Sequence, residues 1–345
     1  LELKTVFDNL AEQPLKAIVL TGDYITHLDG KLIYGGSLDE AVDQMRGVPG
    51  TSIRLTVVRT GRDKPFDVTV TRQIIEIKPV KWEIRNGVGI ININGFSKQT
   101  GAMTKAAVVS IEKALGRKPF GYVIDLRSNP GGLLDQAVEV SDVFLDRVEV
   151  VSQRGRDKRD IERYFAQPGD FANGLPIVVL VDSGSASAAE IVAGALQDHH
   201  RGLVLGERTF GKGSVQTLIP LDEKTALRLT TARYYTPSGR SIQGTGIEPD
   251  IEVLATREET RAGQPPRDRE ADLRRSLRND GQAETRAPIP PPPMNLPAGL
   301  AERVAREPAE GAPAFDPTKP ETDHQLQQGL ILLRGMASAP RATQR

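Results

Sequence analysis

The clearest structural signal in the chain is the run Ile177-Val178-Val179-Leu180-Val181, followed by the small-residue turn 182–187 and the apolar stretch 188–196. The first five residues are all apolar and mostly β-branched, which predicts a strand buried on both faces of a sheet. Residues 188–196 are mainly Ala, Ile, Val and Leu, and they predict a buried helix. The pattern therefore predicts a strand-turn-helix unit with Ser187 at the corner, at or just before the helix N-terminus.

The corner position makes Ser187 a candidate nucleophile. Unpaired backbone N–H groups at a helix N-terminus favour negative charge, and the N–H of Ala188 could stabilise the oxyanion of a tetrahedral intermediate. Taken alone, the same turn is also typical of a serine that only caps a helix. A second chemical group is needed to separate the two interpretations.

Lys212, in Gly211-Lys212-Gly213, supplies a candidate base. A lysine accepts a proton only in its neutral form, which an apolar and desolvating pocket favours. The flanking glycines leave room for the side chain to turn inward. The alternative is a solvated surface lysine between two turn glycines.

A third segment, Asp125-Leu126-Arg127-Ser128-Asn129-Pro130-Gly131-Gly132, follows a predicted strand at 122–126 and precedes a helix that opens near Leu133. Glycines leave the backbone N–H accessible, so such a turn can direct an amide at a developing oxyanion. We predict Gly131 as the donor, with Gly132 as the alternative. A turn that merely joins a strand to a helix remains open for this segment.

These three segments, together with the fourth motif Tyr-Tyr-Thr-Pro-Ser-Gly-Arg-Ser-Ile-Gln at 234–243, resemble the carboxy-terminal processing peptidases, or tail-specific proteases, from Gly121 to about Asp250. The resemblance places the nucleophile on Ser187, the general base on Lys212 and the residue that orients the lysine on Gln216. It implies a serine endopeptidase that cleaves near the C-terminus of its substrates through a Ser-Lys dyad and an acyl-enzyme. Neither a metal nor an organic cofactor is implied.

The resemblance also implies an α/β (α+β) core of the ClpP/crotonase-like type, with a mixed sheet, over residues 73–255. Alternating strand and helix patterns through Leu205 and a long predicted strand at 225–234 agree with this. In the family, the loop after that late strand borders the substrate cleft. Arg240 is therefore a candidate ligand for a peptide carboxylate, and a surface arginine in a turn is the alternative.

Residues 1–72 read as strand, turn, helix and strand, and they resemble a partial PDZ domain. In that family an extended C-terminal tail pairs with a strand edge beside the helix. Leu38 and Val42 lie on one face of the predicted helix and are candidate groove residues, with packing against the sheet as the alternative. The chain begins without a signal-peptide pattern, so we interpret it as a fragment of a longer protein.

The last 90 residues change in composition, because 13 of the 24 prolines fall there. Residues 256–320, which contain the run Pro290-Pro291-Pro292-Pro293, are predicted to be a disordered, Pro-rich linker. Residues 321–345 are predicted to form a C-terminal helix and tail. The apolar spacing within 323–334 would let this helix dock on the core or on a second subunit.

Composition excludes several classes of function. The chain has 45 basic and 45 acidic residues, which predicts no attraction to nucleic acid. It has no cysteine, which excludes thiol catalysis, and its four histidines show no Ser-His-Asp spacing. The expected partners are proteins or peptides with apolar C-termini, and in addition an adaptor or a second copy of the chain.

Residence in the periplasm or another extracytoplasmic compartment is expected from the resemblance alone, with membrane association through a preceding segment as an option. Two other functions stay open. The first is a catalytically inactive, PDZ-containing scaffold that binds peptides. The second is an enoyl-CoA hydratase-like enzyme, whose related fold also uses Gly-Gly turns, although Ser187 and Lys212 have no role in that chemistry.

Overall fold

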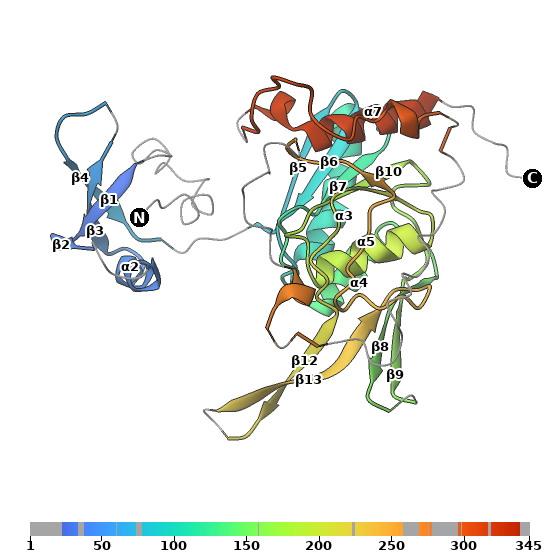
Figure 1. Cartoon of the computed structure of the whole chain (residues 1–345), viewed down its shortest axis with the longest axis horizontal. Helices are drawn as coiled ribbons and strands as arrows, with labels where there is room; N and C mark the ends of the chain where they lie inside the picture. Colours follow the sequence, from blue (N-terminus) through green and yellow to red (C-terminus); the bar gives the residue numbers. More distant parts are fainter. Residues whose placement is uncertain are drawn as a thin grey trace, which may run out of the picture. The chain divides into compact units, whose positions relative to one another are not determined.

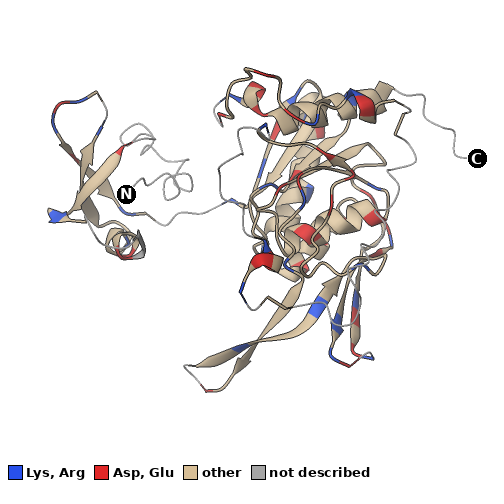
Figure 2. Ribbon diagram, in the orientation of Figure 1, with Lys and Arg blue, Asp and Glu red and all other residues tan. Residues whose placement is uncertain are grey.

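The computed structural model describes residues 23–33, 38–59, 61–73, 78–157, 159–222, 225–257, 269–274, 276–277, 296–297, 299–316 and 319–338, with only the backbone of residues 38 and 39. The chain divides into two compact units, Leu1–Lys78 and Pro79–Arg345 (Figure 1). This division lies close to the predicted boundary between residues 72 and 73. In Figure 2, Lys and Arg are interspersed with Asp and Glu along the ribbon of both units.

The N-terminal unit is an antiparallel sheet with one short helix. Its strands lie in the order β2-β1-β3-β4, and their bounds are β1 Tyr24–Leu28, β2 Lys31–Leu32, β3 Ser52–Val58 and β4 Phe66–Thr71. Ile53, Leu55 and Val57 alternate along β3 into the core, as one buried face of a sheet requires. Helix α2, Leu38–Met45, adds Ala41 to the same core. The predicted order of strand, turn, helix and strand is confirmed.

The second unit is built on a six-stranded mixed sheet in the order β14-β11-β10-β7-β6-β5. All neighbours are parallel except β5 and β6, which are antiparallel. The bounds are β5 Val80–Arg85, β6 Val88–Ile93, β7 Tyr122–Asp125, β10 Ile177–Val181, β11 Leu203–Gly206 and β14 Ile251–Glu252. The mixed sheet of the sequence prediction is thereby confirmed.

Helices cover both faces of this sheet (Figure 1). One face carries α3 (Thr100–Leu115), α4 (Leu134–Asp142) and α5 (Ala188–Asp198). The other face carries α7 (His324–Ser338). Successive side chains of β10 point to opposite faces of the sheet and contribute to the hydrophobic core on each face. Val179 and Val181 pack with α3, α4 and α5, whereas Val178 and Leu180 pack with α7. A strand buried in this way reads as a continuous apolar run.

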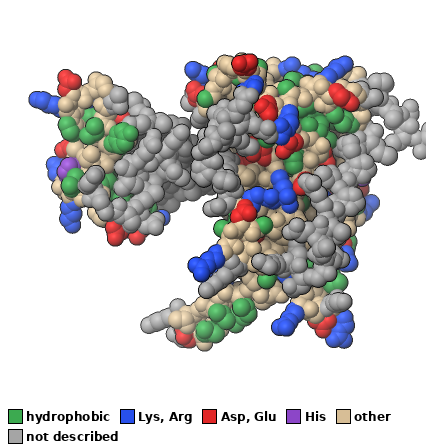
Figure 3. Space-filling model, viewed as in Figure 1, with side chains coloured by type: hydrophobic (Ala, Val, Ile, Leu, Met, Phe, Trp, Pro, Cys, Tyr) green, Lys and Arg blue, Asp and Glu red, His purple; other side chains and the backbone are tan. Residues whose placement is uncertain are grey.

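A second antiparallel sheet has the order β12-β13-β8-β9. Its strands are β8 Glu149–Gly155, β9 Ile161–Phe165, β12 Ser214–Pro220 and β13 Ala226–Tyr235, the last of which is the predicted long strand. The hairpin of β12 and β13 projects from the core, and Figure 3 shows apolar side chains on it. The exposed large apolar residues of this hairpin are Leu218, Ile219, Leu221, Leu227 and Leu229.

The prediction of disorder over all of 256–320 is wrong for the residues that the structure describes there. Short 3-10 turns occur at Glu270–Asp272, Ala301–Arg303 and Pro320–Thr322. Leu300 is buried against α7, and the Arg306 carbonyl accepts a hydrogen bond from the Leu254 N–H (2.8 Å). A few apolar side chains suffice because α7 offers them a surface. The proline run 290–293 lies outside the described residues.

Helix α7 docks on the core, which is one of the two outcomes expected for it. A β carbon on Gly329 would lie 3.4 Å from Val178 and 3.6 Å from Leu180, so this position of the helix faces β10 at ordinary van der Waals distance. In the part of the chain that the structure describes, no helix combines the length and apolarity needed to cross a bilayer.

Candidate active site

Ser187 lies at the corner between β10 and α5, where it is the N-cap residue of the helix. Its backbone has φ +56° and ψ −112°, a conformation that residues with a side chain rarely adopt. Such a conformation costs about 1–3 kcal/mol and is concentrated at functional sites. The predicted position of Ser187 is therefore confirmed, and the strain indicates that the corner is held by its surroundings.

The buried carboxylate of Glu190 holds this corner and the lysine loop together. Its Oε2 accepts hydrogen bonds from the backbone N–H groups of Ser187 (2.8 Å) and Lys212 (2.9 Å). Its Oε1 accepts from the Gly211 N–H (2.7 Å) and the Thr209 hydroxyl. One side chain thus fixes the backbone of both candidate catalytic residues.

Sequence reasoning quoted Glu190 only as part of a motif and assigned it no role. Two signals could have identified it. Ser187 and Glu190 have the spacing of a capping box, and the acid interrupts an otherwise apolar helix. Burial raises the pKa of Glu190 to about 7, although the hydrogen bonds from Thr209 and the three backbone amides act in the opposite direction.

Lys212 lies in the loop between β11 and β12 and is half-buried. The loop packs tightly against the fourth motif, since the Gly213 N–H donates to Gln243 Oε1 (3.1 Å). A β carbon at Gly213 would lie 2.3 Å from the Gln243 nitrogen, so only glycine fits. Among the described residues no hydrogen bond joins Lys212 Nζ to Ser187 Oγ. The structure brings their backbones together without linking the two side chains.

Gln216 lies on β12, four residues after Lys212, and is exposed. The β12–β13 pairing shifts register between Val215 and Gln216. Such a bulge re-aims the side chains that follow it. Within the described part of the chain Gln216 makes no hydrogen bond to Lys212, so its predicted orienting role stays a prediction.

The Gly131-Gly132 turn lies directly against the nucleophile corner. A β carbon at Gly131, whose φ is +95°, would lie 2.6 Å from the Ala186 carbonyl oxygen, 2.8 Å from Ser187 Cβ and 2.9 Å from the Ala188 nitrogen. The two predicted oxyanion-binding residues, Gly131 and Ala188, therefore lie next to each other. No side chain fits between the turn and the corner.

The two glycines of this turn differ in whether the backbone N–H already has a hydrogen-bond partner. The Gly131 N–H donates to the Asn129 side-chain oxygen (2.8 Å). Among the described residues, the N–H groups of Gly132 and Ala188 have no hydrogen-bond partner. The geometry therefore favours Ala188 and the alternative donor Gly132, while Gly131 supplies the close approach.

We expect Gly131→Ala to abolish catalysis and to destabilise the fold. The added methyl group has no room, and overpacking typically costs about 1–3 kcal/mol, to which the positive φ adds. Gly116→Ala is the matched control, because Gly116 has φ +64° and nothing within 4 Å of its β carbon. Urea unfolding and peptide cleavage would measure both variants. A Gly131→Ala protein that cleaves at the parent rate contradicts the placement of this turn.

The prediction that Arg240 binds substrate is not supported by its position. Its guanidinium forms an ion pair with Asp198 and donates to Gln197 Oε1 (2.8 Å). Asp198 ends α5, about 16 Å from Ser187 at 1.5 Å per residue. A cation at a helix C-terminus is stabilised by the helix dipole, which explains this placement.

The candidate groove residues belong to the N-terminal unit. Val42 lies on α2 and is half-buried. The Leu38 side chain lies outside the described residues. The structure therefore supports a helix at the expected place but leaves the groove as a prediction.

Comparisons with known proteins agree with this geometry. Residues 87–253 match the model of Peptidase family S41. A carboxy-terminal-processing protease of Bartonella bacilliformis (strain ATCC 35685 / KC583 / Herrer 020/F12,63) is 47% identical over 321 residues, which cover 93% of this chain and 69% of that protein. A CtpA-like serine protease assigned in Staphylococcus aureus (strain COL) is 39% identical over 233 residues, 67% of this chain and 46% of that one.

Solved structures show the same likeness. A Bacteroides fragilis NCTC 9343 protein assigned to the S41 proteases shares the fold with a TM-score of 0.51 at 22% identity, over 71% of this chain and 69% of that chain. The photosystem II D1 C-terminal processing protease aligns with a TM-score of 0.48 at 32% identity, over 69% and 65% of the two chains. The matched family and its carboxy-terminal-processing relative define a serine-type peptidase. The chain belongs to peptidase family S41, together with its carboxy-terminal-processing relatives, as predicted.

Proposed function

We propose that this chain is an endopeptidase that cleaves protein substrates near their C-termini, with Ser187 as nucleophile and Lys212 as general base. The observation that carries the proposal is the Glu190 carboxylate, which accepts hydrogen bonds from the backbone amides of both residues. A buried acid shared by the two segments has no evident use in a turn that only caps a helix.

The reaction follows from the positions of these groups. The neutral Lys212 amine removes the proton of the Ser187 hydroxyl, and Oγ attacks the substrate carbonyl. The oxyanion accepts hydrogen bonds from the N–H of Ala188, at the N-terminus of α5, and from the N–H of Gly132. Lys212 then protonates the leaving amine, and water releases the acyl group. In this scheme Gln216 orients the lysine amine once substrate lies beside β12.

We also propose a ClpP/crotonase-like core and a PDZ-type N-terminal unit. In support of the former, the Gly-Gly turn after β7 packs on the nucleophile corner. In support of the latter, a small antiparallel sheet carries a helix with a buried apolar face. Such a sheet edge can pair with an extended tail, which would select substrates with apolar C-termini. Action outside the cytoplasm, with an adaptor or a second copy as partner, completes the proposal.

The test is cleavage of an unstructured protein that ends in apolar residues, followed by mass spectrometry. A second substrate that ends in charged residues and is otherwise identical controls for tail recognition. We expect cuts near the C-terminus of the first substrate and slower cleavage of the second. Equal cleavage of both contradicts tail selection but not peptidase activity. Binding of the apolar tail without any cleavage would favour the noncatalytic, peptide-binding scaffold.

A further inference from the structure

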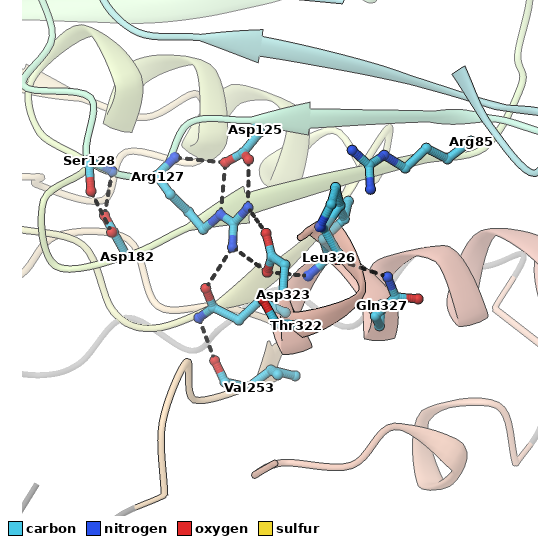
Figure 4. A network of polar contacts seen from close by, with 12 residues as sticks. Arg85, Asp125, Arg127, Ser128, Asp182, Val253, Thr322, Asp323, Leu326 and Gln327 are labelled. Carbon is cyan, nitrogen blue, oxygen red and sulfur yellow. Dashed lines mark hydrogen bonds and ion pairs between the residues drawn. The ribbon is translucent and has the colours of Figure 1, made fainter. Parts of the chain in front are cut away.

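Arg127, in the turn that follows β7, lies between two carboxylates (Figure 4). Its Nε and Nη2 donate to the two oxygens of Asp125 (2.9 and 2.6 Å). Its Nη1 and Nη2 donate to the two oxygens of Asp323 (2.8 and 2.7 Å), which is 196 residues away in the chain. Both pairs are bidentate, the geometry in which arginine fixes orientation as well as charge.

Asp323 lies at the N-terminus of the C-terminal helix. It directly precedes α7, and its Oδ1 accepts the Leu326 N–H (3.0 Å), so it also caps that helix. Gln325 adds a second link, because its Oε1 accepts from Arg127 (3.2 Å) and its Nε2 donates to the Val253 carbonyl (2.8 Å). The N-terminus of α7 is therefore anchored on the turn that carries Arg127.

That turn leads directly to the active site. The residue after Arg127, Ser128, donates through its N–H to Asp182 Oδ1 (2.8 Å), in the turn that precedes Ser187. The Ala186 N–H in turn donates to the Asn129 carbonyl (2.9 Å). Gly131, which contacts the nucleophile corner, lies four positions after Arg127. A displacement of Arg127 would therefore move both the Gly131-Gly132 turn and the turn that leads to Ser187.

The charges explain why the contact is specific. The side chains of Arg127, Asp125 and Asp323 are mostly buried, and the two carboxylates raise the pKa of the guanidinium well above its ordinary value despite burial. Removing one partner of a buried pair costs much more than removing an exposed pair. Without Asp323, Arg127 would keep its ion pair with Asp125, but the side of the guanidinium that faces α7 would exchange a carboxylate for the neutral Gln325 oxygen.

We propose that Asp323 is a positioning residue for catalysis: through Arg127, the N-terminus of α7 holds the 126–132 turn in the geometry that binds the oxyanion beside Ser187. The inference rests on the proposed function of that site. It assigns the C-terminal helix a role in turnover as well as in covering the sheet.

Asp323→Asn and Asp323→Glu separate charge from helix capping. Asparagine caps a helix as well as aspartate but removes the ion pair, whereas glutamate keeps the charge and caps poorly. We expect Asp323→Asn to lower kcat about tenfold with KM within about twofold of the parent, and Asp323→Glu to retain more of the parent kcat. Glu252→Gln, which removes an exposed ion pair with Arg306, is the control and should leave both constants unchanged.

Amide hydrogen exchange gives a second measurement that does not depend on activity. We expect Asp323→Asn to speed exchange within 126–132 more than within 326–336. If the parent fails to cleave any substrate, the proposed function fails, and faster exchange in 126–132 still supports the coupling. A parent-like kcat and parent-like exchange in Asp323→Asn would overturn it. So would a loss of kcat that only follows the fraction of unfolded protein.

Discussion

Ser187→Ala and Lys212→Arg should each lower kcat by about 10⁴-fold or more, since removal of one member of a catalytic set costs nearly as much as removal of all. Alanine provides no nucleophile. Arginine keeps the length and the positive charge of Lys212, yet its guanidinium stays protonated and cannot accept the serine proton. The Lys212→Arg result therefore tests a base rather than a cation.

The measurement is steady-state cleavage of a peptide with an apolar C-terminus, with circular dichroism to show that each variant is folded. Ser183→Ala and Lys113→Arg are matched controls. Ser183 lies in the same turn as Ser187, and Lys113 is exposed on α3. Both should cleave at the parent rate. Substantial activity in Lys212→Arg would exclude the Ser-Lys mechanism while leaving Ser187 as a candidate nucleophile.

Glu190→Gln is expected to have the second-largest effect, on both activity and stability. The carboxylate accepts four hydrogen bonds, and three of the donors are backbone N–H groups that cannot turn away. In Glu190→Gln the side-chain NH₂ group would replace one acceptor oxygen and would face N–H donors. Each buried backbone N–H that loses its acceptor costs about 1–3 kcal/mol of stability. We expect a loss of about 3 kcal/mol or more in the free energy of unfolding and a fall in kcat of about 100-fold.

The pH dependence of stability identifies Glu190 independently. Its pKa is about 7 in the folded chain against an ordinary value of 4.5. Between these values the folded state binds the proton and the unfolded state does not, so this group makes stability fall as pH rises. The contribution is about 3 kcal/mol in total, and it is level below pH 4.5 and above pH 7.

Urea unfolding at pH 5 and pH 8 would measure this effect. We expect the parent to lose stability relative to Glu190→Gln across that interval, because the glutamine does not titrate. Glu302→Gln, on an exposed turn, should keep the parental pH dependence. An identical pH dependence in the parent and in Glu190→Gln would show that burial does not raise the pKa of this group.

Local patterns were sufficient for the elements around the site. The apolar run 177–181 and the small residues after it predicted β10, α5 and the corner at Ser187, because burial on both faces leaves a continuous hydrophobic signal. The Gly-Gly turn was predictable for a similar reason, since a strand-to-helix turn with bare amides needs residues without a side chain. Elements whose information is local could therefore be predicted residue by residue.

The C-terminal segment shows the limit of composition. Its prolines and charges predicted disorder, yet Leu300 and Val304 pack against α7 in the structure. The apolar spacing of α7 predicted a helix, but it did not predict which surface the helix would pack against. Arg240 was similarly predictable as a turn residue, whereas its partner Asp198 becomes its neighbour only after folding.

The family, the strand-turn-helix order and the candidate pair Ser187 and Lys212 could be predicted from the sequence, because motifs and apolar periods are properties of neighbouring residues. Folding alone reveals that Glu190 joins the two candidate catalytic segments and that Asp323, directly before α7, reaches Arg127. Both contacts depend on burial, which brings distant segments together and makes an unpaired charge costly. A polar residue in the sequence does not reveal which partner will satisfy it.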